Sequence, residues 1–146
     1  MSARTVIDAD GLILGRMASI VAKRLLSGES IDIVNAQKIV ISGQRVSLIG
    51  EWKDFLQTGG KRKGPTHFRM PNMIVRRTIR GMLPYRIPKG DKAFKRLRVY
   101  IGVPEEFAEV QTQRIAQAES SSLNHKFVTV GELAESIGWN KKGVVE

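Results

Sequence analysis

The stretch TVIDADGLILGRMASIVAKRLLSG, residues 5–28, decides the class of fold. Its first part, TVIDADG at 5–11, is a short apolar run that ends in a polar turn, which predicts a β-strand. Its second part, RMASIVAKRLLSG at 16–28, repeats apolar side chains at spacings of three and four residues and ends in Ser27-Gly28. That spacing predicts an amphipathic helix with a glycine stop. A strand followed by a helix is the beginning of an α/β unit.

Two further strands and a second helix follow this unit. The segment IDIVNAQKIVIS at 31–42 contains two β-branched runs, at 31–34 and 39–41, with a polar step between them. The step is too short for an ordinary helical crossover, so the pairing of these two strands stays open. The segment QRVSLIGEWKDFLQ at 44–57 carries apolar side chains at helical spacing. The predicted order is therefore strand, helix, strand, strand, helix.

A long loop and an unusual helix occupy the middle of the chain. Residues 58–72 combine Gly, Pro and basic side chains without periodicity, which predicts a loop. The helix expected over 74–83 should end there, because Pro84 cannot continue the helical hydrogen bonds. On a helical wheel, one half of this helix is apolar and the other half presents arginine. The two sets are Ile74, Val75, Ile79, Met82 and Leu83 against Arg76, Arg77 and Arg80.

We expect the apolar half of this helix to be buried against the sheet or against the helix that contains Trp52. The polar half carries arginine and no lysine, which matters because a guanidinium pairs bidentately with phosphate and stacks on bases. Only Phe68, Tyr85 and Phe94 are aromatic between residues 61 and 98, so a single-strand binder built on stacking platforms is disfavoured. Contacts with phosphates and with RNA shape fit this segment better.

The last part of the chain contains clearer signals. DKAFKRL at 91–97 predicts a short helix capped by its first residue, and RVYIG at 98–102 predicts a strand in the middle of the sheet. Further on, Thr129 and Glu132 have the spacing of a capping box, and Gly138 is placed to end the helix that they begin. The chain therefore ends in another helix.

The composition is that of an ordinary globular protein. The chain has 146 residues, 42% hydrophobic and 26% charged, which suits a single domain over residues 1–146. It contains no cysteine, which excludes disulfides and thiolate chemistry and fits a reducing compartment. No apolar run approaches the roughly 18 residues of a membrane span, and residues 1–11 lack the features of a signal peptide. We therefore expect a soluble cytoplasmic protein with no membrane partner.

The net charge of +10 is concentrated in one segment. Residues 61–98 contain 13 basic side chains and a single acid, Asp91. Such a block attracts polyanions, and nucleic acid is the most abundant polyanion in a cytoplasm. We therefore predict an RNA-binding segment over 58–98, with a solvated basic face as the alternative. The side chains expected to contact RNA are Lys61, Arg62, Lys63, Arg69, Arg76, Arg77, Arg80, Arg86, Lys89, Lys92, Lys95, Arg96 and Arg98.

The strand-to-helix junction DADGLILGRMAS, residues 8–19, has to be tested as a nucleotide site, because α/β proteins often bind phosphates at such junctions. The spacing of Gly11 and Gly15 fits neither the phosphate loop nor the dinucleotide fingerprint. Asp8 and Asp10 are expected to form the turn rather than a pair of catalytic carboxylates. The junction therefore favours a structural role.

No catalytic or metal-binding constellation is evident in the sequence. His67 and His125 lie far apart and form no metal-ligand pattern, and there is no G-x-S-x-G nucleophile elbow. His67 lies among basic residues, so we expect it either to contact a phosphate or base or simply to be exposed. The sequence thus predicts no enzyme, no cofactor, no metal and no small-molecule substrate.

Three motifs, in this order, resemble the universal large-subunit ribosomal protein family numbered thirteen: NAQKIVISG at 35–43, RRTIRGMLP at 76–84 and KAFKRLRVYIG at 92–102. The pattern Arg-x-x-Arg-Gly-Met-Leu-Pro is quite specific. The short amino terminus and FVTVGELAESIGW at 127–139 resemble the archaeal and eukaryotic branch of that family. None of these motifs falls within residues 103–124.

The resemblance implies a three-layer α/β/α fold around a small, mainly parallel sheet of about four strands, with the basic loop and helix as an insertion. It implies a structural constituent of the large ribosomal subunit that binds large-subunit rRNA early in assembly, next to other ribosomal proteins, without catalysis or a cofactor. RNA contact carries over to Arg77, Arg80, Arg86, Lys95, Arg96 and Arg98, and the loop residues rest on charge alone. A nucleotide- or phosphate-binding enzyme and a DNA-binding regulator are the alternatives.

Overall fold

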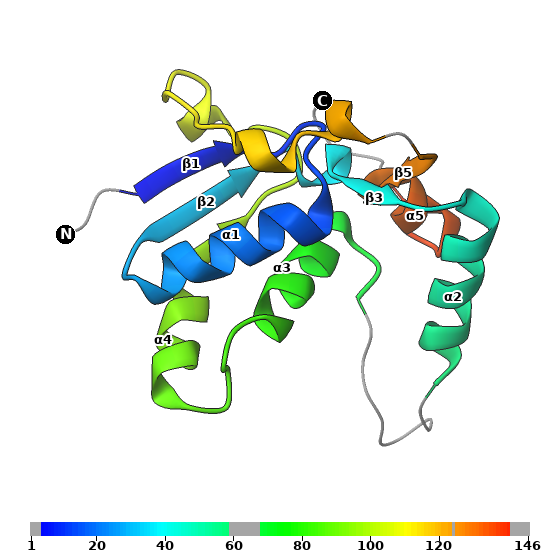
Figure 1. Ribbon diagram of the computed structural model, residues 1–146, viewed down its shortest axis with the longest axis horizontal. Helices are drawn as coiled ribbons and strands as arrows, with labels where there is room; N and C mark the ends of the chain where they lie inside the picture. Colours follow the sequence, from blue (N-terminus) through cyan, green and yellow to red (C-terminus); the bar gives the residue numbers. More distant parts are fainter. Residues whose placement is uncertain (1–3, 59–67, 124, 141–146) are drawn as a thin grey trace.

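The sheet at the centre of the fold is parallel. The computed structural model describes residues 4–58, 68–123 and 125–140. Strands β1 (Arg4–Asp8), β2 (Ser30–Val34) and β4 (Leu97–Val99) form a sheet in the order β1-β2-β4, and both pairs are parallel. The α/β class and the mainly parallel sheet are therefore confirmed (Figure 1).

The middle position of this sheet belongs to β2. All five of its residues are buried, which is typical of a central strand in a parallel sheet. The prediction that the strand near 98–102 would lie in the middle is wrong, because β4 pairs with β2 alone and so forms an edge of the sheet. Beyond β4 the chain stays beside the end of β2. The Tyr100 amide donates to the Ile33 carbonyl at 2.8 Å, and the Asn35 amide donates to the Gly102 carbonyl at 2.9 Å.

One arginine holds the three strands together at their amino-terminal ends. Asp32 is only 1% exposed, and Arg4 donates from Nε and Nη2 to its carboxylate oxygens over 2.6–3.0 Å. The same guanidinium donates to the Arg96 carbonyl at 3.0 Å, just before β4 begins. A buried carboxylate needs such a partner, because an unpaired charge in the interior is strongly destabilising. The bond to Asp32 also raises the pKa of Arg4.

The pairing that the sequence left open is resolved by a strand from the far end of the chain. Within the described residues, β3 (Val40–Ser42) stays outside the central sheet and pairs antiparallel with β5 (Phe127–Thr129). The 3-10 turn η1 (Ala36–Lys38) redirects the chain between β2 and β3, and Asn35 precedes it at a φ of 60°. The central sheet therefore has three strands where about four were expected.

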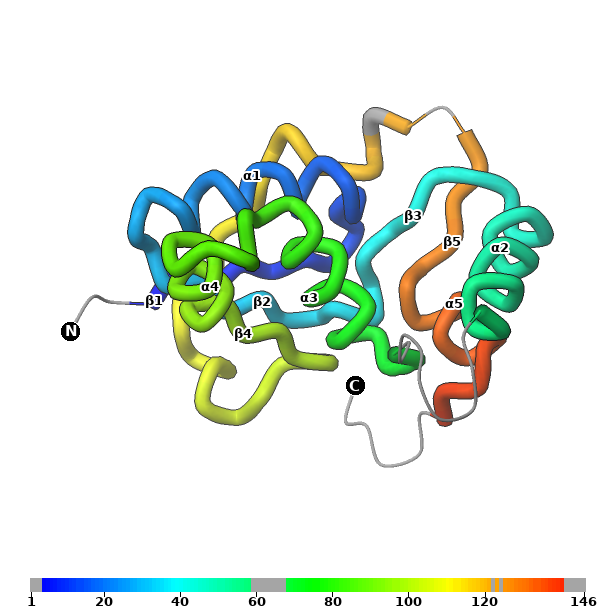
Figure 2. Tube along the Cα trace, turned by 90° about the horizontal axis from the view of Figure 1, so that it is seen from below, coloured from blue at the N-terminus to red at the C-terminus, as the bar shows by residue number. Residues whose placement is uncertain are grey.

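Helices α1 (Leu14–Leu26), α3 (Pro71–Gly81) and α4 (Pro88–Lys95) lie together on one face of the sheet, as the two views agree (Figure 2). In α1 the apolar residues Met17, Val21 and Leu25 of the predicted face are buried, and Ile20 is partly buried. The helix ends at Leu26, Ser27 is its C-cap, and Gly28 follows with a φ of 107°. Helix α3 packs against both α1 and β4. This packing places α3 next to β4, the strand that carries the exposed Arg98.

Helices α2 (Arg45–Gln57) and α5 (Val130–Ser136) stand at the other end of the molecule (Figure 1). The capping prediction for α5 is confirmed, because the Glu132 amide donates to Thr129 Oγ1 at 3.2 Å. Gly138, at a φ of 117°, follows the end of this helix. The helical prediction for α2 is also confirmed, but none of its 13 residues, all of which the structure describes, is buried.

The polar segment after β4 contributes to the core despite its composition. It contains three 3-10 turns, η2 (Glu105–Phe107), η3 (Ala116–Ala118) and η4 (Ser120–Ser122). Ile115 and Ala118 are buried in the main hydrophobic cluster. The Ile13 amide donates to the Ala118 carbonyl at 2.7 Å. This segment therefore packs over the junction between β1 and α1.

Candidate nucleic-acid interface

Helix α3 is anchored by the apolar half that the sequence predicted. Pro71 occupies the first turn, where its missing amide costs nothing, and the helix ends at Gly81, ahead of Pro84. Of the predicted apolar set, Ile74, Val75, Ile79 and Leu83 are buried. Met82 is 43% exposed, so its predicted burial is wrong. Met82 lies one residue beyond the helix, where the helical spacing no longer decides which way a side chain points.

The arginines on the other half of α3 are held by aromatic rings. The Arg76 guanidinium carbon lies 4.3 Å from the ring centroid of Phe94, and that of Arg80 lies 4.2 Å from the ring centroid of Tyr85. Arg86 approaches the same Tyr85 ring at 5.8 Å. These distances are those of cation–π contacts, which fix a guanidinium without using its N–H donors. The contact with Phe94 therefore leaves the N–H donors of Arg76 available to an anion, whereas Arg80 and Arg86 also hydrogen-bond the Tyr85 phenol.

Positive charge around Tyr85 also changes its acidity. The guanidinium of Arg86, and after it that of Arg80, hydrogen-bonds the phenol and lowers its pKa. Both arginines favour the phenolate over the neutral phenol, as any concentrated positive field does. The lowered pKa of Tyr85 thus reflects the positive charge at this surface.

A hollow opens between these arginines. It is lined by Phe68, Met73, Arg76, Arg77, Arg80 and Phe94, and we call it the arginine hollow. All three arginines that the sequence placed on one helical face contribute to it. The structure thus brings these predicted site residues together around one depression, and two aromatic rings form part of its wall.

Helix α4 continues the basic surface. The predicted cap at Asp91 is wrong, because the helix begins earlier: Ile87 is the capping residue and Pro88 opens the first turn. The Asp91 carboxylate instead pairs with Lys95 at 3.2 Å on an exposed turn of the helix. The other residues on and next to α4 that were predicted to contact RNA and are exposed are Arg86, Lys89, Lys92 and Arg98.

A model of the ribosomal protein L13 family matches residues 3–106 of this sequence. The large ribosomal subunit protein uL13 of Methanopyrus kandleri is 46% identical over 142 residues, covering 95% of this chain and 89% of its own length. The protein of the same name from Methanosarcina barkeri is 48% identical over 136 residues, covering 92% of this chain and 97% of its own. The chain belongs to the ribosomal protein L13 family. The family resemblance inferred from three motifs is thereby confirmed, and both relatives are archaeal.

Membership of this family makes the protein a structural ribosomal component rather than an enzyme, as predicted. The family match ends at residue 106, so the segment that carries η3 and η4 lies beyond it. Among the described residues, no helix is long and apolar enough to cross a membrane. In the same part of the chain, the His, Asp and Glu side chains form no group of three that could hold a metal ion.

Arg96 differs from the other predicted contacts, because its side chain is used inside the protein. Its Nη2 donates to the Leu25 carbonyl at 2.6 Å, in the last turn of α1, where the Gly28 amide donates to the same oxygen at 3.1 Å. Its Nε is buried without a hydrogen-bond partner within the described residues. The neighbouring Arg98 is exposed. The motif match could not separate these two arginines, since both lie in the same basic run.

Another predicted contact, Arg69, is not among the residues that line the arginine hollow. Arg69 is exposed, and its Cδ is 3.5 Å from the position that a Cβ on Gly138 would take, next to the end of α5. The predicted contacts Lys61, Arg62 and Lys63 lie outside the described residues, as does His67.

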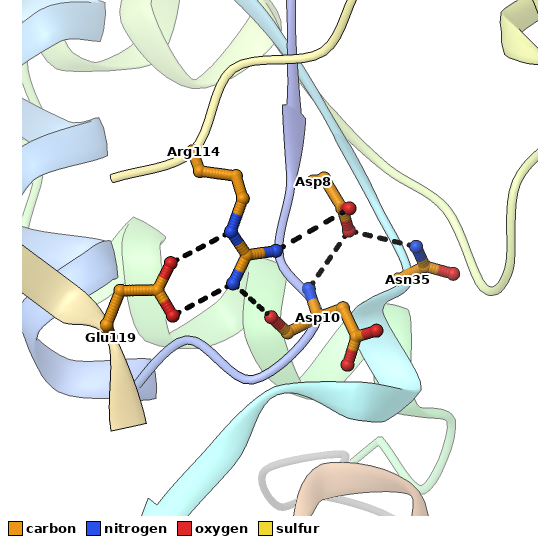
Figure 3. A network of polar contacts seen from close by, with 5 residues as sticks. All are labelled: Asp8, Asp10, Asn35, Arg114 and Glu119. Atoms are coloured by element: carbon orange, nitrogen blue, oxygen red, sulfur yellow. Dashed lines mark hydrogen bonds and ion pairs between the residues drawn. The ribbon is translucent and has the colours of Figure 1, made fainter. Parts of the chain in front are cut away.

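The junction at residues 8–19, considered above as a nucleotide site, is crossed by a network of hydrogen bonds and ion pairs between protein groups (Figure 3). Arg114 donates to both carboxylate oxygens of Glu119, at 2.8 and 2.9 Å, and to the Asp10 carbonyl at 2.7 Å. Its guanidinium also lies 3.6 Å from Asp8. The Asp8 carboxylate accepts from the Asp10 amide at 3.1 Å and from the Asn35 amide group at 2.9 Å. Asp8 therefore forms the turn, as predicted.

Sequence reasoning missed the aromatic partners of the arginines. Tyr85 and Phe94 were noted only as too few for a stacking surface, whereas each holds one arginine of α3. Trp52 and Phe55 were noted only for their helical spacing. Trp52 packs partly against the core, and both rings also line a pocket with Arg77. No local signal reveals these contacts, because they join residues that lie between 5 and 25 positions apart.

Proposed function

We propose that this protein is a structural constituent of the large ribosomal subunit that binds large-subunit rRNA through the arginine face of α3 and the exposed basic side chains of α4 and β4. The single observation that carries the proposal is the arginine hollow, in which Arg76 and Arg80 are held over aromatic rings. A free arginine loses side-chain entropy when it binds, and one already fixed by a ring loses less.

The contacts proposed within the described residues are Arg69, Arg76, Arg77, Arg80, Arg86, Lys89, Lys92, Lys95 and Arg98. Lys61, Arg62 and Lys63 are proposed on charge alone. We leave Arg96 out of this set, since its guanidinium already caps α1. We further propose that residues 1–146 act as one domain in the cytoplasmic ribosome, that it joins the subunit early, and that other large-subunit proteins are its neighbours.

The experiment that tests this function measures affinity for an rRNA fragment as a function of salt. If six to ten basic side chains meet phosphates, affinity should fall about 10³- to 10⁵-fold between 50 and 200 mM salt. The double change Arg77→Glu and Arg80→Glu should weaken binding and flatten this dependence, because each lost phosphate contact removes about one unit of slope. The double variant should stay folded, since both side chains lie on the polar half of α3.

A matched control has the same net charge as the double variant of Arg77 and Arg80. Lys23→Glu and Arg45→Glu change the charge by the same amount at exposed positions on α1 and α2, away from the arginine hollow. The proposal expects near-normal binding from this control. Equal loss in both variants would mean that net charge alone attracts the RNA. Failure of the tagged protein to sediment with large subunits would contradict the function itself.

A further inference from the structure

A second pocket adjoins the arginine hollow, and its walls are aromatic. It is lined by Trp52, Phe55, Phe68, Ile74 and Arg77, and we call it the aromatic pocket. The rings of Trp52 and Phe55 meet edge to face, with centroids 5.7 Å apart. Phe55 is 48% exposed and Phe68 is 36% exposed. Exposed aromatic rings that gather in a pocket are typical of binding surfaces rather than of an ordinary solvated face.

The two depressions share part of their walls. Phe68 and Arg77 line both the aromatic pocket and the arginine hollow, so the two lie directly side by side. One depression offers flat apolar rings, and the other offers three guanidinium groups. A single nucleotide has the same division, with a flat base at one end and an anionic phosphate at the other.

We propose that the two adjoining depressions hold one unpaired nucleotide of RNA, with its base against Trp52 and Phe55 and its phosphate beside Arg77. The proposal rests on the RNA-binding function proposed above and specifies the kind of RNA element that this face takes. A base inside a duplex has both faces covered by its neighbours, so the occupant must come from a bulge, a loop or an end. Sequence-selective RNA binding commonly uses such splayed bases, stacked on aromatic side chains.

The charge around the aromatic pocket favours RNA over an apolar protein segment. Arg77 forms part of its wall, and Arg76 and Arg80 stand in the adjoining hollow. An apolar protein side chain that covered the aromatic pocket would remove water from Arg77 without supplying an anion, which is costly. The phosphate attached to a stacked base supplies that anion at the required place. One nucleotide therefore satisfies both chemistries at once.

The test uses the full chain and two hairpin RNAs that differ only by one bulged nucleotide. Wild-type protein should bind the bulged hairpin more tightly than the perfect one. The change Phe55→Ala should reduce affinity for the bulged hairpin by roughly 5- to 150-fold, the range expected from losing one base–aromatic stack. It should leave the affinity for the perfect hairpin unchanged. Val46→Ala is the matched control, because Val46 is on the same helix, is 84% exposed and lines neither depression.

A direct contact should also be visible by cross-linking. A photoreactive uridine at the bulge should cross-link to Trp52 or Phe55 when the complex is irradiated and analysed by mass spectrometry. Circular dichroism melts check that Phe55→Ala is folded, and Phe68→Ala repeats the experiment from the other wall of the pocket. Both variants should lose the preference for the bulge.

The possible failures of this inference and of the RNA-binding function are distinguishable. If Phe55→Ala and Phe68→Ala keep the full preference for the bulge while the arginine variant loses affinity, the nucleotide site is overturned and RNA binding stands. If Phe55→Ala and Phe68→Ala bind RNA normally yet fail to enter large subunits, the aromatic pocket binds a neighbouring protein instead of a nucleotide. The inference is then again overturned. If wild-type protein binds neither hairpin, the RNA-binding function falls, and the nucleotide site falls with it.

Discussion

The pKa of Tyr85 provides a measure of the positive charge at the proposed interface. Arg86 and Arg80 lower its pKa, with Arg86 the stronger influence. We predict that Arg86→Gln raises the pKa of Tyr85 back toward the ordinary value for tyrosine, because the largest favourable partner of the phenolate is removed. Ultraviolet absorbance titration measures this shift. The chain has only two tyrosines, so Tyr100→Phe as a background leaves a single signal. An unchanged titration curve would contradict the assigned contact.

Arg96 and Arg98 illustrate at the same scale what a motif leaves undetermined. Both lie in KAFKRLRVYIG, and the family resemblance assigned RNA contact to both. The Arg96 side chain turns inward to the Leu25 carbonyl, whereas Arg98 is exposed on β4. The difference follows from position: Arg96 closes the turn after α4, and α1 ends beside it. A contact across 71 residues has no counterpart in the local sequence.

At the scale of elements, the joint between α3 and α4 depends on one glycine. A Cβ at Gly90 would overlap the Pro84 carbonyl, so only glycine fits where the two helices meet. We predict that Gly90→Ala lowers stability by about 3 kcal/mol, the upper range for overpacking a tight site. For a domain of this size the melting temperature should fall by roughly 6–12 °C. RNA affinity should fall with it, since the joint positions α4 against the arginine hollow.

Gly81 provides the matched control for this prediction. It ends α3, is exposed, and a Cβ placed on it meets nothing within 4 Å. Gly81→Ala should leave stability unchanged or raise it by up to about 1 kcal/mol, because alanine is the better helix former. Differential scanning calorimetry of both variants gives the comparison. Equal melting temperatures for the two variants would contradict the close approach at Gly90.

The elements also differ in how far the sequence predicts them. Local chemistry decides α1 and α5, since apolar spacing, Ser27-Gly28 and the Thr129 cap all lie within the segment they define. The sheet needs more than local chemistry. The strand at 98–102 was expected in the middle of the sheet, yet only partners elsewhere in the chain decide whether a strand lies at an edge.

Helix α2 and the interface show the same limit. The spacing of Trp52, Phe55 and their neighbours predicted a helix but not which of its side chains are covered, because periodicity reports which side chains lie together and not what packs on them. The arginine face of α3 was predictable because it lies within a single helix. The aromatic pocket was not, because its walls come from α2, α3 and the residues that precede α3.

At the scale of the whole molecule, the segment after β4 is held in place by the side chain of Arg114. The double hydrogen bond from Arg114 lowers the pKa of Glu119 below its ordinary value of 4.5. The folded state therefore holds a proton on Glu119 less readily than the unfolded chain does. The stabilisation from this pair is fully present above pH 4.5 and is lost as the pH falls through the lowered pKa.

We predict that Arg114→Ala lowers the free energy of unfolding at pH 7 by about 1 kcal/mol, because the pair is partly exposed and screened by solvent. The loss should be smaller at about pH 3 than at pH 7, because protonation of Glu119 as the pH falls through its lowered pKa removes the carboxylate that pairs with Arg114. Urea unfolding at the two pH values measures it, and Arg45→Ala, at an exposed position on α2, serves as the control. A loss of the same size at both pH values would contradict the role given to Glu119.

The pairing of β3 with β5 sets the order in which this chain can complete its fold during synthesis. Val40 pairs with Thr129, so the partner of β3 is translated almost ninety residues later. At a synthesis rate of about 5–20 residues per second, the edge of β3 that pairs with β5 stays unpaired for roughly 4–18 s. Until then its unpaired backbone can associate with other chains. A message truncated before β5 should therefore yield an aggregating product, even though it encodes the whole arginine face.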